Sequence, residues 1–236
     1  MNQEPGTSIF TLLVIRCFDL LFTVVALVAL SPIFFLVAIA LRFSGEGEIF
    51  FCQERIGKGG KNIKLFKFAT MIKNSHAIGT GELTIPNDSR VLPLGRILRK
   101  TKLNELPQLF NILTGDLSLI GPRPQTRRYH DLFLEADRNL INTIRPGLSG
   151  VGSILFRDEE SILVNVSDPV TFDDKIITPY KGQVEHWFAM NQSVSLYFEL
   201  IITTALVLMF PSCRLHKRLL CRVPAPPEVL SKLLSI

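Results

Sequence analysis

The chain has 236 residues, enough for one sizeable hydrophobic core and too few for several enzymatic domains. Apolar residues make up 47% of it, a high share for a water-soluble protein, and they gather near its two ends, which points to a membrane. The net charge of +5, from 26 basic and 21 acidic side chains, suits anionic lipids, phosphorylated substrates and nucleic acid equally.

Two further features narrow the class of protein. The four cysteines, Cys17, Cys52, Cys213 and Cys221, show no CxxC spacing, which predicts free thiols in a reducing compartment. The basic residues form no stripe interleaved with aromatic side chains, and no nucleic-acid motif is present. We therefore expect no nucleic-acid partner.

Residues 12–41 are almost entirely apolar, which predicts a membrane-embedded helix longer than the roughly 20 residues that a simple span requires. Ser31 and Pro32 interrupt this stretch. Proline removes one backbone hydrogen bond and clashes with the preceding turn, so we expect a bend there. Arg16 and Arg42 give both ends a basic residue. A straight span with a tolerated proline and a re-entrant hairpin with both ends in the cytoplasm are therefore both open.

Residues 43–193 are predicted to form a soluble domain. Apolar runs at residues 49–52 and 63–68, separated by a Gly/Lys turn at 57–60, predict short strands, and 78–86 reads as a loop. Helices are expected at residues 89–100, with Asp88 as the cap, at 104–113, ending at Gly115, and at 126–141.

Two loops rich in Gly, Pro and Arg follow, at residues 121–124 and 145–147. Such loops can cradle phosphates, whereas a single arginine is more often a solvated surface charge. The two loops together favour a phosphate site.

The last part of the chain, residues 194–236, is predicted to hold an apolar helix at 194–210 and a basic tail. One alternative is an interfacial helix that buries Phe198, Ile201, Leu206 and Phe210 in the lipid headgroup region. The other is a core helix of the soluble domain. We divide the chain at residues 1–42, 43–193 and 194–236.

Five blocks of the chain, in the same order, resemble the bacterial sugar transferases, which are monotopic polyprenyl-phosphate phosphoglycosyl transferases. The resemblance covers residues 16–204. The blocks are RCFDLLFTVVALVALSPIFFLVAIALRFSGEGEIFFCQERIGKGGK, KLFKFATM, GRILRKTKLNELPQLFNILTGDLSLIGPRP, RPGLSG and the weaker MNQSVSLYFELIITT. The most specific part is LPQLFNILTGDLSLIGPRP.

The resemblance implies a fold and a location. The fold class is α+β: a re-entrant membrane helix broken at Ser31 and Pro32, a small and mostly helical catalytic domain with a short strand region, and interfacial amphipathic helices. Both ends of the membrane helix face the cytoplasm, and the domain rests on the inner leaflet of a bacterial inner membrane. Membrane lipids and other glycan-assembly enzymes are the expected partners.

The resemblance also implies a reaction. An acidic side chain attacks the sugar-linked phosphate of a UDP-sugar, releases UMP, and passes the phospho-sugar to undecaprenyl phosphate, with Mg²⁺ as cofactor. The product begins the assembly of a lipid-linked glycan. Neither the sugar nor the oligomeric state follows from the sequence.

Such chemistry needs a carboxylate, a divalent cation and fixed positive charge on the transferring oxygens. Glu105 matches the family's acidic residue at a helix start and is expected to bind Mg²⁺. Lys67, Arg99, Arg123 and Arg145 match basic positions of the family's motifs and are candidates for diphosphate contacts.

The chain departs from the family at the expected nucleophile. The usual Asp-Glu pair reads Asn104 and Glu105 here, and an amide is a poor nucleophile. Three explanations are open. The chain is an engineered or inactive variant, it transfers directly in a ternary complex oriented by Glu105 and Mg²⁺, or another carboxylate has taken the role.

Two further departures alter the charge of the site. After RPGLSG, Arg157 keeps the family's arginine and is expected to approach the phosphates. It is followed by Asp158, Glu159 and Glu160, which are either the replacement carboxylate or a solvated acidic helix start. Ala69 stands where the family has arginine in KFRTM. A subfamily with a changed mechanism and a catalytically impaired membrane scaffold both fit these departures.

Overall fold

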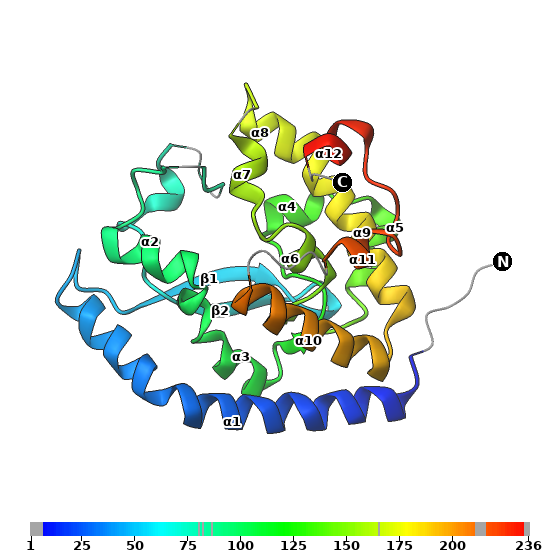
Figure 1. Cartoon of the computed structure of the whole chain (residues 1–236), viewed down its shortest axis with the longest axis horizontal. Coiled ribbons are helices and arrows are strands. Elements are labelled where there is room, and N and C mark those ends of the chain that lie inside the picture. Colours follow the sequence, from blue (N-terminus) through cyan, green and yellow to red (C-terminus); the bar gives the residue numbers. More distant parts are fainter. Residues whose placement is uncertain are drawn as a thin grey trace.

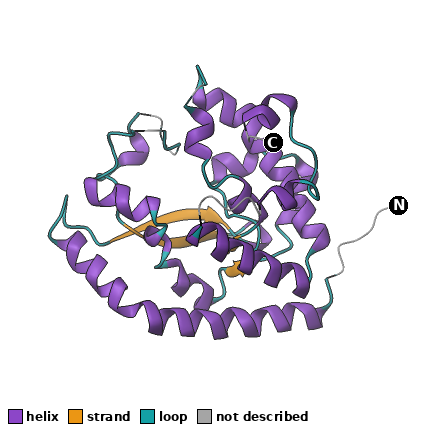
Figure 2. Cartoon of the chain, in the orientation of Figure 1, coloured by secondary structure: helices purple, strands orange, loops and turns teal. Residues whose placement is uncertain are grey.

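A computed structural model describes residues 7–79, 81, 83–85, 87–164, 166–210 and 216–233. A long N-terminal helix, α1 (Ile9–Arg42), runs along one side of a mostly helical domain (Figure 1). Strands make up a small part of the chain and lie in the middle of the domain (Figure 2). The fold is therefore α+β and mostly helical, as the sequence predicts.

The remaining helices and strands are short. In chain order they are β1 (Phe50–Ile56), β2 (Asn62–Phe68), α2 (Pro93–Lys100), α3 (Gln108–Thr114), β3 (Ser118–Ile120), α4 (Arg127–Asp131), α5 (Glu135–Ile141), β4 (Gly147–Ser149), α6 (Val151–Leu155), α7 (Glu159–Leu163), α8 (Pro169–Phe172), α9 (Thr178–Asn191), α10 (Val194–Met209), α11 (His216–Leu220) and α12 (Glu228–Leu233). A 3₁₀ turn, η3 (Leu103–Glu105), precedes α3, and a π-helical segment, η4 (Asp173–Ile177), precedes α9.

Helix α1 is the one helix, among the described residues, that is long and apolar enough to cross a membrane. It continues without interruption through Pro32 and curves around the domain (Figure 1). Pro32 has no N–H to give to the carbonyl of Val28, and the Ser31 hydroxyl donates a hydrogen bond to that oxygen instead, at 2.8 Å. The serine therefore satisfies a carbonyl that lipid could not. The straight span and the re-entrant hairpin both stay predictions.

The polar residues that interrupt the apolar stretch fasten α1 to the domain. Arg16 donates hydrogen bonds to the carbonyls of Ile112 and Leu113 at the end of α3, at 2.7 and 3.2 Å. Asp19 is fully buried and accepts hydrogen bonds from the Ser118 hydroxyl at 3.0 Å and the Tyr197 hydroxyl at 2.8 Å. One helix turn of α1 is thus tied to α3, β3 and α10.

The predicted strand pair is confirmed. β1 and β2 form an antiparallel hairpin whose register runs from Phe50 opposite Phe68 to Ile56 opposite Asn62. The Gly/Lys turn closes it, and Gly59 and Gly60 in that turn have φ of 74° and 69°. Side chains two residues apart share a face of the hairpin, so Gln53 and Arg55 lie on the face that carries Lys67.

A second, parallel pair brings the two Gly/Pro/Arg loops together. Ser118 of β3 lies opposite Gly147 of β4, and the Gly147 N–H donates to the carbonyl of Pro122 at 2.8 Å. A Cβ on Gly147 would lie 2.1 Å from the backbone nitrogen of Gly121. Glycine is therefore required here, and these loops use their glycines to pack backbone on backbone.

Two predicted helix starts are wrong. Helix α2 begins at Pro93 and not at residue 89, because Asp88 binds the Arg90 guanidinium, and that guanidinium also donates to the carbonyls of the preceding loop. The helix predicted from residue 104 begins at Gln108, after Pro107, so Asn104 lies in the turn η3. Its predicted end at Gly115 is confirmed, with φ of 92°.

The helix predicted at residues 126–141 is also wrong in part, because α4 and α5 replace it and the chain leaves helical geometry at residues 132–134. Phe133 in this break is 4% exposed. Its ring fills space beside Gly182 of α9. Burial of one aromatic side chain here outweighs a continued helix.

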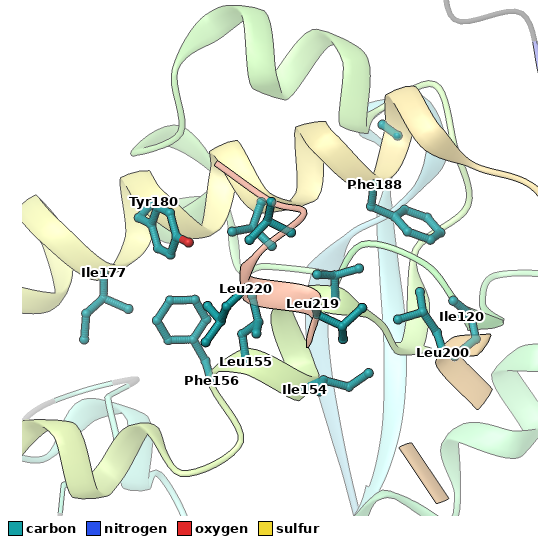
Figure 3. Close-up of a cluster of buried hydrophobic side chains, with 14 of the residues drawn as sticks. Ile120, Ile154, Leu155, Phe156, Ile177, Tyr180, Phe188, Leu200, Leu219 and Leu220 are labelled. Atoms are coloured by element: carbon teal, nitrogen blue, oxygen red, sulfur yellow. The ribbon is translucent and has the colours of Figure 1, made fainter. Parts of the chain in front are cut away.

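The main core lies between α6, α9, α10 and α11, where Tyr180, Phe188 and Leu200 pack with Phe156 and Leu219 (Figure 3). One face of α10 belongs to this core, so the prediction of a core helix holds for that face. The predicted lipid contacts Phe198 and Ile201 pack against the core.

The opposite face of α10 is exposed and apolar, with Ile202, Leu208, Met209 and Phe210 at its surface. A lipid contact on this face stays a prediction. Cys17, Cys52 and Cys221 are free and exposed, whereas Cys213 and much of the basic tail lie outside the described residues.

Asn111 of α3 connects the domain to β2 through its side-chain amide, and a substitution tests this contact. Its fully buried amide accepts a hydrogen bond from the Phe66 N–H at 3.0 Å and donates one to the Lys64 carbonyl at 2.8 Å, so it replaces a neighbouring strand. We expect Asn111→Ala to lower the free energy of unfolding by about 2 to 3 kcal/mol, because two buried backbone groups lose their partners. Denaturation in detergent measures this, with exposed Asn139→Ala as the control. Equal stability of the two variants would contradict the role.

Candidate active site

Basic side chains from several elements surround one carboxylate. Glu105 lies in η3, Arg123 in the loop after β3, Lys67 on β2, Arg55 on β1 and Arg99 in the last turn of α2. The hairpin, the turn before α3 and the Gly121–Pro124 loop thus bring residues from distant parts of the sequence to one place. Formally the five side chains carry four positive charges and one negative charge.

The ion pair at the centre joins Glu105 to Arg123. Their Oε1 and Nη2 atoms are 2.8 Å apart, and the Glu105 side chain is 15% exposed. Burial raises the pKa of Glu105, but the charges of Arg123 and Lys67, with the hydrogen bond, outweigh it and lower that pKa to about 2. Glu105 also raises the pKa of Arg123. The carboxylate is ionised at neutral pH, and the Arg123 side chain, 38% exposed, is open to a ligand.

Lys67 is the titratable cation of this group. Burial and the repulsion of Arg55 lower the pKa of Lys67 to about 7, and Glu105 limits the fall. Repulsion from Arg123 and Arg99 contributes to the same lowering of the pKa of Lys67. The Lys67 ammonium donates a hydrogen bond to the Gln53 side chain at 3.1 Å. An anion bound among these cations would stabilise the charged form of Lys67.

Asn104 is buried beside the ion pair. Its Oδ1 has no hydrogen-bond partner among the residues that the structure describes. Ala69, 6% exposed, puts a methyl group at the end of β2, so no charge is supplied there.

Glu105 fits a magnesium ion that arrives with a diphosphate, because it is an ionised carboxylate. In the described part of the chain no three His, Cys, Asp or Glu side chains are arranged to hold a metal by themselves. Mg²⁺ at a nucleotide takes one or two protein carboxylates and completes its shell with phosphate oxygens and water. The Glu105 carboxylate would supply such a ligand, whereas Asn104 Oδ1 is itself buried.

Two of the predicted phosphate ligands lie elsewhere. Arg145 interacts with Arg16, Asp19 and Asp116, on the side of the domain that faces α1, and burial lowers the pKa of Arg145. Arg157 donates to the carbonyl of Val207 at 2.6 Å, at the end of α10. Neither contact brings these arginines to Glu105.

The predicted replacement carboxylates differ in position. Asp158 is 67% exposed and pairs with Arg157 at 2.8 Å. Glu159 pairs with Lys181 at 2.6 Å, and its charge raises the pKa of Arg123. The side chain of Glu160 lies outside the described residues. Of the two described carboxylates, Glu159 is the one whose charge acts on Arg123.

Three residues of this region were not among those predicted from the sequence. Gln53 and Arg55 carried a signal, because they alternate with the exposed Cys52 and Glu54 of β1 and share the face of Lys67. Glu185 of α9 also lies here: its Oε1 accepts a hydrogen bond from the Arg123 N–H at 3.1 Å. In the sequence, Glu185 was distinguished only as a single glutamate among apolar helix residues, beside Val184 and Phe188.

The Lys67 amine is expected to titrate near pH 7, whereas an ordinary lysine does so near about 10.4. Glu105→Gln removes the charge that favours protonation and should lower the midpoint further. A lysine side-chain NMR titration in detergent measures both values, with Lys67→Met to identify the resonance and exposed Glu54→Gln as the matched control. An ordinary midpoint in the wild type would contradict the effect of burial on the Lys67 pKa. An upward shift in Glu105→Gln would contradict the effect of the Glu105 charge.

Comparison with known proteins places the chain in a family. A model described as bacterial sugar transferase matches residues 10–211. The chain is 37% identical over 145 residues to the UDP-N-acetylgalactosamine-undecaprenyl-phosphate N-acetylgalactosaminephosphotransferase of Aeromonas hydrophila, and the match covers 59% of this chain and 33% of that protein.

Other relatives include the exopolysaccharide production protein ExoY of Sinorhizobium fredii, 36% identical over 166 residues, with 64% of this chain and 73% of that protein covered. The UDP-glucose:undecaprenyl-phosphate glucose-1-phosphate transferase of Escherichia coli is 33% identical over 163 residues, with 67% and 34% covered. The chain thus spans about a third of the length of the Aeromonas and Escherichia proteins. It belongs to the bacterial sugar transferases, a family of polyprenyl-phosphate phosphoglycosyl transferases.

Proposed function

We propose that this chain transfers a phospho-sugar from a UDP-sugar to undecaprenyl phosphate, giving a polyprenyl-diphosphate-sugar and UMP. The observation that carries the proposal is the ionised carboxylate of Glu105 beside Arg123 and Lys67, with Arg55 and Arg99 close to Lys67. Relatives named for this transfer with UDP-glucose or UDP-N-acetylgalactosamine support it. The step would begin the synthesis of an exopolysaccharide or another lipid-linked glycan.

The cations suit a diphosphate that changes its charge distribution during transfer. Fixed donors in a partly water-excluded site stabilise the charge that develops on the transferring and leaving oxygens. Arg123 and Arg99 are arginines, whose planar groups match phosphate oxygens, and Lys67 adds a compact charge. Mg²⁺ held by Glu105 would neutralise further charge on the diphosphate.

The membrane helix brings this site to its lipid acceptor. Helix α1 packs on α3, and η3, which carries Glu105, immediately precedes α3. The exposed apolar surface of α1, with Val28, Phe35 and Ile39, suits the bilayer interior. We place the protein in a bacterial inner membrane with its domain on the cytoplasmic face, where UDP-sugars are available.

The amide at Asn104 bears on the choice between a direct transfer and a two-step transfer. In a direct transfer, an oxygen of the acceptor phosphate attacks the sugar-linked phosphorus while the bond to the UMP oxygen breaks. The electron pair leaves with UMP, and no enzyme-bound intermediate forms. In a two-step transfer a carboxylate attacks first, and Glu159, held by Lys181 beside Arg123, is the described alternative to Glu105. Direct transfer requires no new nucleophile from the protein.

A second candidate function is a membrane scaffold for other glycan-assembly enzymes. The specific observations in its favour are Asn104 at the family's nucleophile position and the buried Ala69 methyl where the family carries a charge. A scaffold would keep α1 and the fold, and would release no UMP.

Purified protein in detergent, given undecaprenyl phosphate, Mg²⁺ and a panel of UDP-sugars, is expected to release UMP with at least one donor. Glu105→Gln should lower turnover by about 100-fold or more, because a charge that orients the diphosphate and its metal is lost. Glu54→Gln, which alters an exposed glutamate of β1, is the control. Absence of UMP with every donor would favour the scaffold.

Omitting the acceptor separates the two mechanisms. Direct transfer predicts no UMP from wild-type protein without undecaprenyl phosphate, because nothing else attacks the phosphorus. Asn104→Asp supplies a carboxylate, and we expect this variant to release about one UMP per active site without acceptor. A stoichiometric burst from the wild type would instead point to a carboxylate nucleophile, and its loss in Glu159→Gln would identify Glu159.

A further inference from the structure

Glu185 is a buried carboxyl group that the reaction proposed above does not use directly. It lies on α9 and is 1% exposed, next to the core residues Val184 and Phe188. Burial raises the pKa of Glu185 to about 7, although the Arg123 N–H, the Arg123 charge and Lys181 act in the opposite direction. A group that is costly to bury needs a compensating contact.

That contact is the backbone of Arg123. The Arg123 N–H donates to Glu185 Oε1 at 3.1 Å. Because Pro122 and Pro124 have no N–H, Arg123 supplies the one backbone donor of this three-residue segment. The Arg123 side chain reaches in the other direction, to Glu105 at 2.8 Å. Arg123 is therefore held at its backbone by α9 and at its guanidinium by η3.

Helix α6 is shaped around the same carboxyl group. A Cβ built on Gly152 would lie 2.4 Å from Glu185 Oε1, closer than real contacts allow. Gly152 of α6 thus leaves the space in which this oxygen of Glu185 accepts the hydrogen bond from the Arg123 N–H. The other oxygen, Oε2, is buried and has no hydrogen-bond partner among the described residues.

We propose that Glu185 is a positioning residue: by holding the Arg123 backbone it places the Arg123 guanidinium for the diphosphate of the donor. This role rests on the proposed function for its effect on turnover. Glu185 acts through Arg123 and does not touch the substrate. Small displacements of a group that orients a reacting phosphate cost up to about 100-fold in rate.

The first test compares two substitutions of similar volume. Glu185→Met fills the space and cannot accept a hydrogen bond, whereas Glu185→Gln keeps an oxygen acceptor without a carboxylate. We expect Glu185→Met to lower kcat/KM for the UDP-sugar by about 10- to 100-fold, and Glu185→Gln to recover most of that loss. Glu228→Gln, on exposed α12, is the control. Equal losses in the Met and Gln variants would overturn the proposal, because a hydrogen-bond acceptor would then not be enough.

The second test asks whether Glu185 works through Arg123. In Arg123→Ala the guanidinium is absent, so adding Glu185→Met should cause no further loss of kcat/KM. Gly152→Ala, which displaces the carboxyl group, should resemble Glu185→Met and should also add nothing to Arg123→Ala. Multiplying losses in the double variants would overturn the proposal, since general destabilisation acts independently of the guanidinium.

Binding of UDP-sugar, measured by calorimetry on the same variants, separates this proposal from the proposed function. If the wild type binds the donor but releases no UMP, the transferase proposal fails. The positioning role is then decided by affinity: weaker binding in Glu185→Met, recovery in Glu185→Gln, and no added loss in the double variant support it. Unchanged affinity in Glu185→Met would overturn it.

Discussion

The ion pair between Glu105 and Arg123 is the interaction on which the candidate site depends. Removing a carboxylate from water is costly, and Glu105 stays ionised here because Arg123 and Lys67 outweigh its burial. The pair joins the turn before α3 to the loop after β3. Backbone packing holds that loop and hydrogen bonds from Arg16 hold the end of α3, so the charges are in place before a ligand arrives.

Short sequence patterns correctly predicted the elements whose structure depends on residues close together in the chain. Alternating side chains and a glycine turn predicted the β1–β2 hairpin, and Gly115 ends α3 because it accepts a positive φ. Predicted helix starts were wrong where a side chain binds a group other than the helix N-terminus. Asp88 has the chemistry of a helix cap, but it binds the guanidinium of Arg90, which gathers the carbonyls of a whole loop. A single sequence does not distinguish these two uses of one carboxylate.

The sequence predicted the kind of charge at the site better than it predicted which charges belong there. Lys67, Arg99 and Arg123 lie near Glu105, whereas Arg145 and Arg157 turn toward α1 and α10. The spacing of a motif places a residue in a loop, but it does not determine the direction in which the side chain points. Glu185 could not be found this way at all, because its partner lies 62 residues away and is a backbone group, which leaves no complementary side chain to recognise.

Asn104 changes the site in two ways that favour different outcomes. An amide removes a nucleophile, and relative to aspartate it also removes a negative charge, so less acidic charge would oppose the binding of a diphosphate by the cations. Tighter ground-state binding lowers KM without raising the rate of the chemical step. Such a site turns over efficiently only if the attacking oxygen comes from elsewhere, and the phosphate of a lipid acceptor carries one. Because α1 packs on α3 beside the turn that holds Glu105, a membrane around α1 would bring the lipid acceptor of the proposed reaction next to the site. The proposed direct transfer would therefore use the cations, the amide and the membrane helix together.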